Sequence, residues 1–171
     1  MAVATKKIRR RRNAGELAVE QTRDLASVAG MLTAAGMLAD GVDSPGGCYL
    51  MAYVGDEVAG VIGIEARVDA ALIRSLMVVD AVRRRSIGAA LIAAARTAAH
   101  TRGARTLYAI APGEDAVSYL ERFGFTPIAS EKLIAALAGT FMVDYLRAHP
   151  DELARHRTLA LDIANDGVIV R

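Results

Sequence analysis

An apolar run leads directly into a basic turn and a long alanine-rich segment. The run, Ala71–Val79, is interrupted only by Arg74 and Ser75, and its length and apolar character predict a strand at the centre of a sheet. The later segment, Ala89–Arg102, favours a helix that Gly103 ends. A central strand that feeds a helix through a short turn is typical of α/β proteins, so this segment predicts an α/β fold.

The hydrophobic pattern before and after this segment predicts further strands and helices of the same fold class. Apolar residues alternate with polar ones where we predict strands, and they recur at helical spacing where we predict helices. The predicted elements are a strand over 17–21, a helix from 25 to about 36, a hairpin with strands 49–53 and 58–64, the central strand and helix, a strand over 106–110 and a helix over 116–122. This order is βαβββαβα. Helical pieces around 131–137 and 142–147 and a last strand over 158–163 follow it.

Glycines mark two features of the hairpin. The pair Gly55-Asp56 is a signal for a tight turn between the two strands. Gly60 and Gly63 lie inside the second strand, where they permit a bulge or a close approach of another backbone.

The length and composition set outer limits on the protein. A chain of 171 residues is enough for one domain with a full core and too short for two. No apolar run reaches the length of a membrane helix, and the basic start is not followed by the apolar stretch of a secretory signal, so we expect a cytoplasmic protein without membrane contact. Cys48 is the single cysteine, so an internal disulfide is excluded. We expect Cys48 to be buried and to act as a small hydrophobic residue.

The charges are unevenly distributed. Six of the 21 Lys and Arg residues lie between Lys6 and Arg12, which leaves 15 basic against 19 acidic residues elsewhere, a net charge of −4. We interpret residues 1–13 as a flexible basic tail and 14–171 as the folded domain. The tail lacks the interleaved aromatic residues that stack on bases, so binding of nucleic acid through it is the less favoured of two interpretations.

The basic turn before the central helix is suited to binding an anion. The first backbone N–H groups of a helix have no partner and lie at the positive end of the helix dipole. Gly88, Ala89 and Ala90 are small enough for close contact with a phosphate, and Arg83–Arg85 add charge. The spacing alone favours this reading no more than an exposed basic turn on a structural helix. Neither the phosphate-binding Walker pattern nor the dinucleotide-binding glycine pattern is present.

At this point the sequence resembles the GNAT superfamily of N-acetyltransferases, over about Leu17 to Ile128. The family's acetyl-CoA motif is Gln or Arg, two residues, Gly, one residue, then Gly or Ala, and here it reads Arg83-Arg84-Arg85-Ser86-Ile87-Gly88 with Ser86 at the first glycine. Leu76-Met77-Val78 resembles the strand before that loop. The stretch 120–125, LERFGF, resembles the later helix and its Gly-Phe signature.

The resemblance implies a splayed mixed sheet and acetyl-CoA as cosubstrate. The implied coenzyme contacts are Leu76, Met77, Val78, Arg83, Arg84, Arg85, Ser86, Ile87, Gly88, Ala89 and Tyr119. It also implies direct transfer of the acetyl group to an amine, in which a backbone N–H near Met77 or Val78 stabilises the thioester oxygen. The amine must lose a proton, and among several acidic residues we take Glu65 as the first candidate base.

Besides Ser86, two positions depart from the family pattern. Many members carry a tyrosine that protonates the leaving thiolate where this chain has Leu120, and the neighbouring Tyr119 would point elsewhere on the helix. Many also carry a glutamate facing the acceptor where this chain has Arg74. Arginine cannot act as a base, but its fork suits a carboxylate or phosphonate on the substrate. An ion pair between Arg74 and Glu65 is an equally weighted alternative.

The string 71–76, ALIRSL, together with the missing tyrosine, resembles more weakly the branch of N-acetylglutamate synthases and arsenic-resistance-associated acetyltransferases. The predicted function is therefore acetyl transfer to a small, acidic amine. Ser86 and Leu120 motivate one alternative, a GNAT-fold sensor that binds acyl-CoA without catalysis. The basic tail motivates another, a protein N-acetyltransferase addressed by that tail. His149 and His156 lack further ligands at a convincing spacing, so we expect no metal site; a homodimer is left open.

Overall fold

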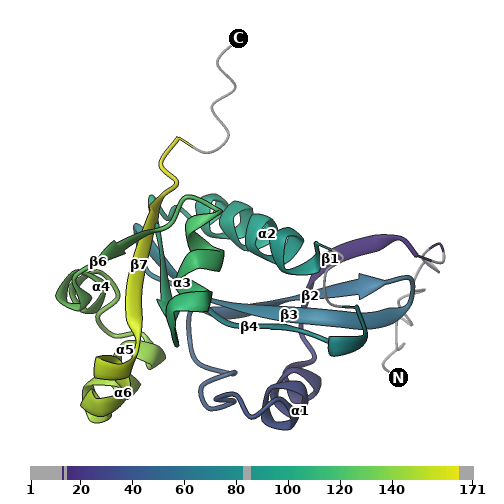
Figure 1. Cartoon of the computed structure of the whole chain (residues 1–171), viewed down its shortest axis with the longest axis horizontal. Coiled ribbons are helices and arrows are strands. Elements are labelled where there is room, and N and C mark those ends of the chain that lie inside the picture. Colours follow the sequence, from purple (N-terminus) through teal and green to yellow (C-terminus); the bar gives the residue numbers. More distant parts are fainter. Residues whose placement is uncertain (1–12, 14, 83–85, 166–171) are drawn as a thin grey trace, which may run out of the picture.

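A seven-stranded mixed sheet with helices on both faces forms the protein (Figure 1). The computed structural model describes residues 13, 15–82 and 86–165. The strands are β1 (Leu17–Thr22), β2 (Gly47–Val54), β3 (Glu57–Ala66), β4 (Ala70–Val78), β5 (Thr106–Ala111), β6 (Thr126–Ile128) and β7 (Arg157–Asp162). The helices are α1 (Leu25–Ala34), η1 (Asp80–Val82, a 3₁₀ turn), α2 (Ile87–Thr101), α3 (Glu114–Glu121), α4 (Ser130–Ala136), α5 (Phe141–Ala148) and α6 (Pro150–Arg155).

The predicted order βαβββαβα is confirmed from β1 to α3. The strands follow one another across the sheet as β1-β2-β3-β4-β5-β7-β6. Neighbouring strands are antiparallel except for β4 and β5, which are parallel. Helix α2 forms the right-handed crossover that two adjacent parallel strands require, and it begins at Ile87, two residues before the predicted start.

Two short elements in the last third of the chain, β6 and α6, are not predicted from the sequence. Strand β6 has three residues and contains Pro127, which lacks the N–H of a regular ladder and is tolerated because β6 is an edge strand. Helix α6 begins with Pro150 directly after the C-cap residue of α5. Both elements are too short for a hydrophobic period to reveal them, so packing against their neighbours decides their conformation.

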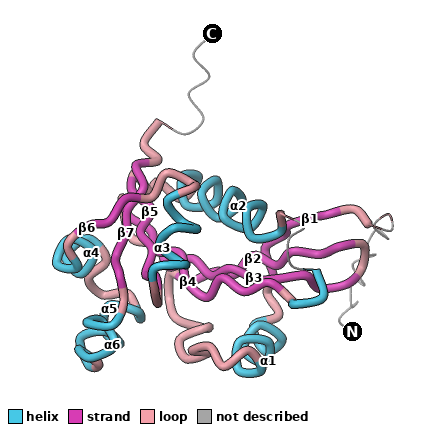
Figure 2. Tube along the Cα trace, viewed as in Figure 1, coloured by secondary structure: helices cyan, strands magenta, loops and turns pink. Residues whose placement is uncertain are grey.

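The core has layers on both faces of the sheet. The largest cluster lies between the sheet and helices α2 and α3, where Leu91, Ala95 and Leu120 are buried. On the other face, α1 covers β2 and β3, and α4 with α5 covers β4 and β5 (Figures 1 and 2). Alternate residues of β4 therefore contact different layers, since Ile73 belongs to the first cluster and Leu72 to the layer under α4.

Two bulges shape the hairpin and the strand after it. The β2–β3 register shifts beside Gly60, and the β3–β4 register shifts beside Gly63, as the two glycines predicted. A side chain at position 60 would lie 2.6 Å from the carbonyl oxygen of Met77, so glycine is required there for β3 and β4 to approach closely.

Cys48 is buried in the large cluster, as predicted. Burial raises the pKa of its thiol, and the charge of Arg102 offsets this in part. A raised pKa leaves less thiolate at neutral pH, and the thiolate is the reactive form. We expect a thiol-specific reagent to modify native Cys48 at least about tenfold more slowly than the urea-unfolded chain. Equal rates would mean that this part of β2 opens readily.

None of the described helices is long and apolar enough to cross a membrane.

Candidate active site

The parallel strands β4 and β5 separate halfway along their length. They are paired from Ala70 and Thr106 to Ile73 and Ala109, but β4 continues to Val78 and β5 to Ala111 without further pairing to each other. Where the two strands separate from each other, a crevice lies at their carboxyl ends, beside the start of α2. Ligands of open α/β sheets commonly bind at such a point, so this crevice is the first candidate site.

A cavity of about 230 Å³ occupies the crevice. Its walls are apolar, with Leu76 from β4, Ala109 from β5 and Leu120 from α3. Tyr119 also lines it, although the sequence analysis expected this side chain to point elsewhere. The shape and apolar lining suit a thin, flexible chain that lies between the two strands.

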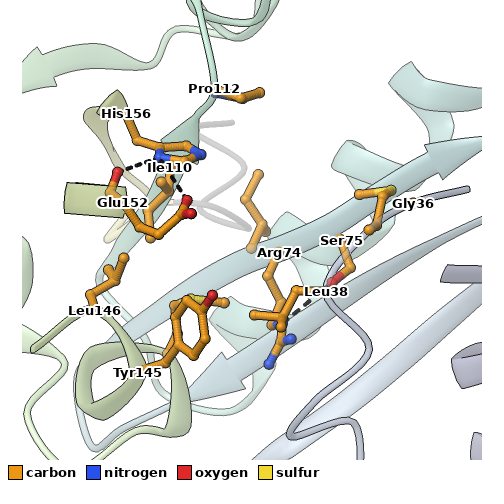
Figure 3. Close-up of a pocket in the computed structure, with 13 residues that line it drawn as sticks. Gly36, Leu38, Arg74, Ser75, Ile110, Pro112, Tyr145, Leu146, Glu152 and His156 are labelled. Carbon is orange, nitrogen blue, oxygen red and sulfur yellow. Dashed lines mark hydrogen bonds and ion pairs between the residues drawn. The ribbon is translucent and has the colours of Figure 1, made fainter. Parts of the chain in front are cut away.

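A second and larger cavity of about 620 Å³ adjoins the first. The two share part of their lining, including Met37, Ile73 and Ser75. The larger cavity is bounded on the far side by Tyr145 from α5 and by His156 just after α6 (Figure 3). The smaller cavity in the crevice and the larger cavity therefore meet at β4. We call the larger cavity the chamber.

Strand β4 carries a bulge where the two cavities meet. Ser75 has φ of 56°, in the left-handed region, and the register with β3 gains one residue between Arg74 and Met77. A serine in this conformation costs about 1 kcal/mol or more. The bulge turns the strand and redirects the backbone groups that follow it.

The ladder after the bulge determines which backbone amides face the crevice. The N–H of Val79 donates to the carbonyl of Ala59 in the β3 direction. Because successive residues of a strand direct their N–H groups to opposite edges, Met77 also faces β3, whereas Val78 faces the crevice. Of the two amides considered for stabilising the thioester oxygen, the geometry favours Val78 over Met77.

The start of α2 lies at the outer end of the crevice. Its N-cap residue, Ser86, has φ of 58° and makes no side-chain capping hydrogen bond. The first residues of the helix, Ile87 to Ala89, follow directly, so their amides form the unpaired N-terminal turn. The predicted basic contacts Arg83, Arg84 and Arg85 lie outside the described residues.

The conformation of Ser86 predicts a stabilising substitution. The left-handed region is accessible to glycine without the steric cost that serine has there. We expect Ser86→Gly to raise the free energy of unfolding by about 0.5 to 1 kcal/mol, as measured by urea denaturation. Ser86→Ala keeps the Cβ atom and is the matched control, and a gain of the same size from alanine would contradict this explanation.

Arg74 and Glu65 form a buried ion pair. The Nη1 atom of Arg74 lies 2.6 Å from the Oε1 atom of Glu65, and the two side chains are 4% and 3% exposed. Arg74 also donates from Nη2 to the carbonyl of Asp40 and lies over the ring of Phe141. The second carboxylate oxygen of Glu65 accepts the N–H of Met142. The pair therefore joins β3 and β4 to the loop after α1 and to the start of α5.

This network bears on two sequence-based predictions. The alternative interpretation of Arg74, an ion pair with Glu65, is present in the structure. Both oxygens of Glu65 accept hydrogen bonds from the protein, so the geometry does not favour Glu65 as the base. Arg74 does line both cavities, but its guanidinium is already paired.

The larger cavity contains a second ionisable pair that the sequence analysis did not predict. Glu152 and His156 both line it, with 3.9 Å between Oε2 of Glu152 and Nδ1 of His156 (Figure 3). The i, i+4 spacing on a short helix was the available signal. The sequence could not show that α6 lies against the cavity, because this depends on the packing of α5 and α6.

The sequence model of the acetyltransferase (GNAT) family matches residues 32–125, more than half of the chain. The chain belongs to this family. The matched region contains the separated strands β4 and β5, the start of α2 and the Gly-Phe signature after α3. Members of the GNAT family are acyltransferases that use acetyl-CoA.

Solved structures of GNAT proteins have the same fold. N-acetylglutamate synthase from Neisseria gonorrhoeae, complexed with coenzyme A and N-acetyl-glutamate, superposes with a TM-score of 0.63 at 15% identity, over 86% of this chain and 35% of its own. An acetyltransferase from Bacillus subtilis in complex with CoA gives 0.64 at 21% identity, over 86% of this chain and 99% of its own. An acetyltransferase from Streptococcus agalactiae has a TM-score of 0.62 at 14% identity, over 85% of this chain and 98% of its own. No curated protein sequence matches significantly.

Within the GNAT fold, Gly88 and Tyr119 lie against each other. A Cβ atom at position 88 would lie 2.4 Å from the hydroxyl oxygen of Tyr119. Burial raises the pKa of Tyr119, and the nearby charge of Arg122 lowers it in part, so the hydroxyl is protonated at neutral pH and can donate a hydrogen bond. Tyr119 thus brings a donor to the crevice beside Leu120, the position where many family members carry tyrosine.

Proposed function

We propose that this protein transfers the acetyl group of acetyl-CoA directly to the amine of a small molecule. The observation that carries the proposal is the pair of adjoining cavities at β4, a smaller apolar one of about 230 Å³ in the crevice and a larger one of about 620 Å³, the chamber, which share part of their lining. The crevice suits the pantetheine arm of the coenzyme, and the chamber suits an acceptor. Membership of the GNAT family supports the acyl donor.

The coenzyme is proposed to lie between β4 and α2. The arm pairs with the β4 edge at Leu76 and Val78, while Met77 supports the strand from the opposite face. The pyrophosphate lies at the N-terminal turn of α2, against the amides of Ile87, Gly88 and Ala89. Ser86 shapes that turn, and Arg83–Arg85 supply charge in this proposal.

The chemistry is proposed to depend on two donors at the crevice. The amide of Val78 faces the position of the thioester oxygen and stabilises the negative charge that develops there. The hydroxyl of Tyr119 donates toward the departing sulfur or toward a coenzyme phosphate, since it lies beside Gly88 in the crevice. Neither contribution requires the family's usual tyrosine at position 120.

The acceptor is proposed to be an amine with an apolar body. Met37, Leu38 and Ile110 are among the apolar residues of the chamber. The carboxylate of Glu152, with a side chain 41% exposed, is available to attract an ammonium group, whereas the charge of Arg74 is offset by Glu65. An acidic amine is the second candidate, favoured by the presence of Arg74 in the lining of both cavities.

A substrate screen that follows thiol release tests these proposals together. The panel contains arylalkyl amines, amino acids, acidic amines such as glutamate and aminophosphonates, polyamines and aminoglycosides, each with acetyl-CoA. Arylalkyl amines are expected to react with the highest kcat/KM, and the products should carry one acetyl group on nitrogen by mass spectrometry. Preference for glutamate or an aminophosphonate would select the second candidate.

Calorimetry with acetyl-CoA separates catalysis from binding alone. Tight binding without thiol release from any amine would contradict the proposed transfer and favour the acyl-CoA sensor. Acetylation of peptide N-termini that is lost on deletion of residues 1–13, while small amines never react, would instead favour the tail-addressed protein acetyltransferase. Each outcome differs from that expected of a small-molecule enzyme.

A further inference from the structure

We propose that His156 is the proton acceptor of the reaction, with Glu152 as its charged partner. This inference rests on the proposed function, because it assigns a role in that reaction. The two residues line the acceptor chamber on the side opposite β4 (Figure 3). They come from α6 and the residue after it, a region beyond the family match at residues 32–125.

A backbone contact determines which ring nitrogen of His156 can accept a proton. Nδ1 lies within hydrogen-bond distance of the carbonyl oxygen of Glu152. A carbonyl can only accept, so Nδ1 carries the hydrogen in the neutral ring and Nε2 carries the lone pair. Among the described residues, Nε2 of His156 has no hydrogen-bond partner.

The carboxylate of Glu152 lies beside the ring of His156. The nearer carboxylate oxygen of Glu152 lies 3.9 Å from Nδ1, and opposite charges attract at this distance. The side chain of His156 is 23% exposed, so solvent can remove the proton afterwards. Tyr145 and Arg74 are the other titratable groups of the chamber, and Glu65 offsets the charge of Arg74.

The reaction balances with one proton released. Nε2 of His156 takes a proton from the ammonium group of the acceptor, directly or through a water molecule. The lone pair of the neutral amine attacks the thioester carbon, so that a C–N bond forms and the C=O electron pair moves to oxygen. The C–S bond then breaks as the carbonyl returns. Sulfur keeps the electron pair and takes the second amine proton, while His156 releases the first to solvent.

His156→Asn tests this role with little structural change, because its side-chain nitrogen can retain the hydrogen bond to the Glu152 carbonyl while Nε2 is lost. With the best acceptor of the screen, we expect kcat to fall about 100-fold or more at neutral pH. The affinity for acetyl-CoA, measured by calorimetry, should stay unchanged. The pH profile of the rate should also differ between the wild type and the variant, because the variant lacks the group that takes up the proton.

His149→Asn is the matched control. His149 makes the same type of contact from Nδ1 to a carbonyl four residues earlier, 2.8 Å from the oxygen of Tyr145, but it does not line the chamber. This variant is expected to keep the wild-type rate and pH profile. Added imidazole should restore part of the activity of His156→Ala and leave the rate of His149→Ala, which keeps its activity, unchanged, a result that a purely structural role of His156 would not produce.

The outcomes separate this inference from the proposed function. If the wild-type protein acetylates an amine and His156→Asn keeps its rate and pH profile, His156 is not the proton acceptor and the enzyme assignment stands. Loss of activity in His156→Asn together with a normal fold, no rescue of His156→Ala and an unchanged pH profile would also overturn it. If the wild-type protein releases no thiol with any amine, the proposed function itself fails.

Discussion

Arg74→Leu is expected to lower the free energy of unfolding by about 3 to 5 kcal/mol, because it leaves the carboxylate of Glu65 buried without its cation. Glu65 is 3% exposed and lies 2.6 Å from the guanidinium. The substitution also removes the hydrogen bond to the carbonyl of Asp40 and the contact with the Phe141 ring. Urea denaturation measures the loss.

The double substitution Arg74→Leu with Glu65→Leu distinguishes two causes of the loss. One is the carboxylate left without its cation, and the other is the loss of Arg74's contacts with Asp40 and Phe141. Replacing both partners of a buried ion pair by apolar residues of similar volume often restores stability, so we expect the double variant to recover at least half of the loss. Glu65→Gln alone, which keeps an acceptor oxygen and a similar shape, should cost less than Arg74→Leu.

The same variants decide between the two interpretations of Arg74. If Arg74→Leu leaves stability unchanged and raises KM for acidic amines alone, Arg74 recognises the acceptor and its pairing with Glu65 is of little consequence. If Arg74 serves the buried network instead, Arg74→Leu should lower stability and leave the ranking of acceptor amines by kcat/KM unchanged. The measurement therefore needs both urea denaturation and the substrate panel.

Gly88→Val is expected to weaken binding of acetyl-CoA by about 3 kcal/mol or more, on the order of 100-fold in Kd. A side chain at position 88 keeps a phosphate away from the N-terminal amides of α2, which donate hydrogen bonds to the charged oxygens in our proposal. It also meets the Tyr119 hydroxyl, which lies 2.4 Å from the Cβ position. Calorimetry with acetyl-CoA measures the loss.

Removing the hydroxyl of Tyr119 separates these two causes. In the Tyr119→Phe background the closest contact of a side chain at position 88 is relieved. Gly88→Val should still abolish tight binding there if the amides of α2 contact the coenzyme. Full recovery of affinity in the double variant would show that Gly88 serves only to accommodate Tyr119, and the proposed phosphate position would then be wrong. Thermal unfolding of each variant checks that the fold is intact.

The fold was predictable wherever the chain has long, regular patterns. The apolar run of β4 and the alanine-rich α2 are strongly patterned, and their order fixes a parallel crossover. Short elements carry too few residues for a period, which is why β6 and α6 were missed. Ser86 shows an intermediate case, since the family motif locates the turn but only the structure shows its left-handed conformation.

The part of the candidate site to which we assign the coenzyme was predictable as a strand, turn and helix because it is local in sequence. A strand, a turn and a helix that follow one another bring their backbone groups together without help from the rest of the chain. The larger cavity, to which we assign the acceptor, is not local. It combines Ser75 of β4, Tyr145 of α5 and His156, residues from segments far apart in the chain, and no spacing rule links them.

The sequence by itself determined the α/β class, the order of the first eight elements and the position of the basic turn before α2, because each depends on hydrophobic period or on a contiguous motif. Only the tertiary structure decided that Arg74 is paired with Glu65 and that Glu152 and His156 border the larger cavity. These contacts depend on strand register and on the packing of α5 and α6 against the sheet. Register and packing are properties of the whole core, so the titratable groups that they bring together cannot be read from spacing along the chain.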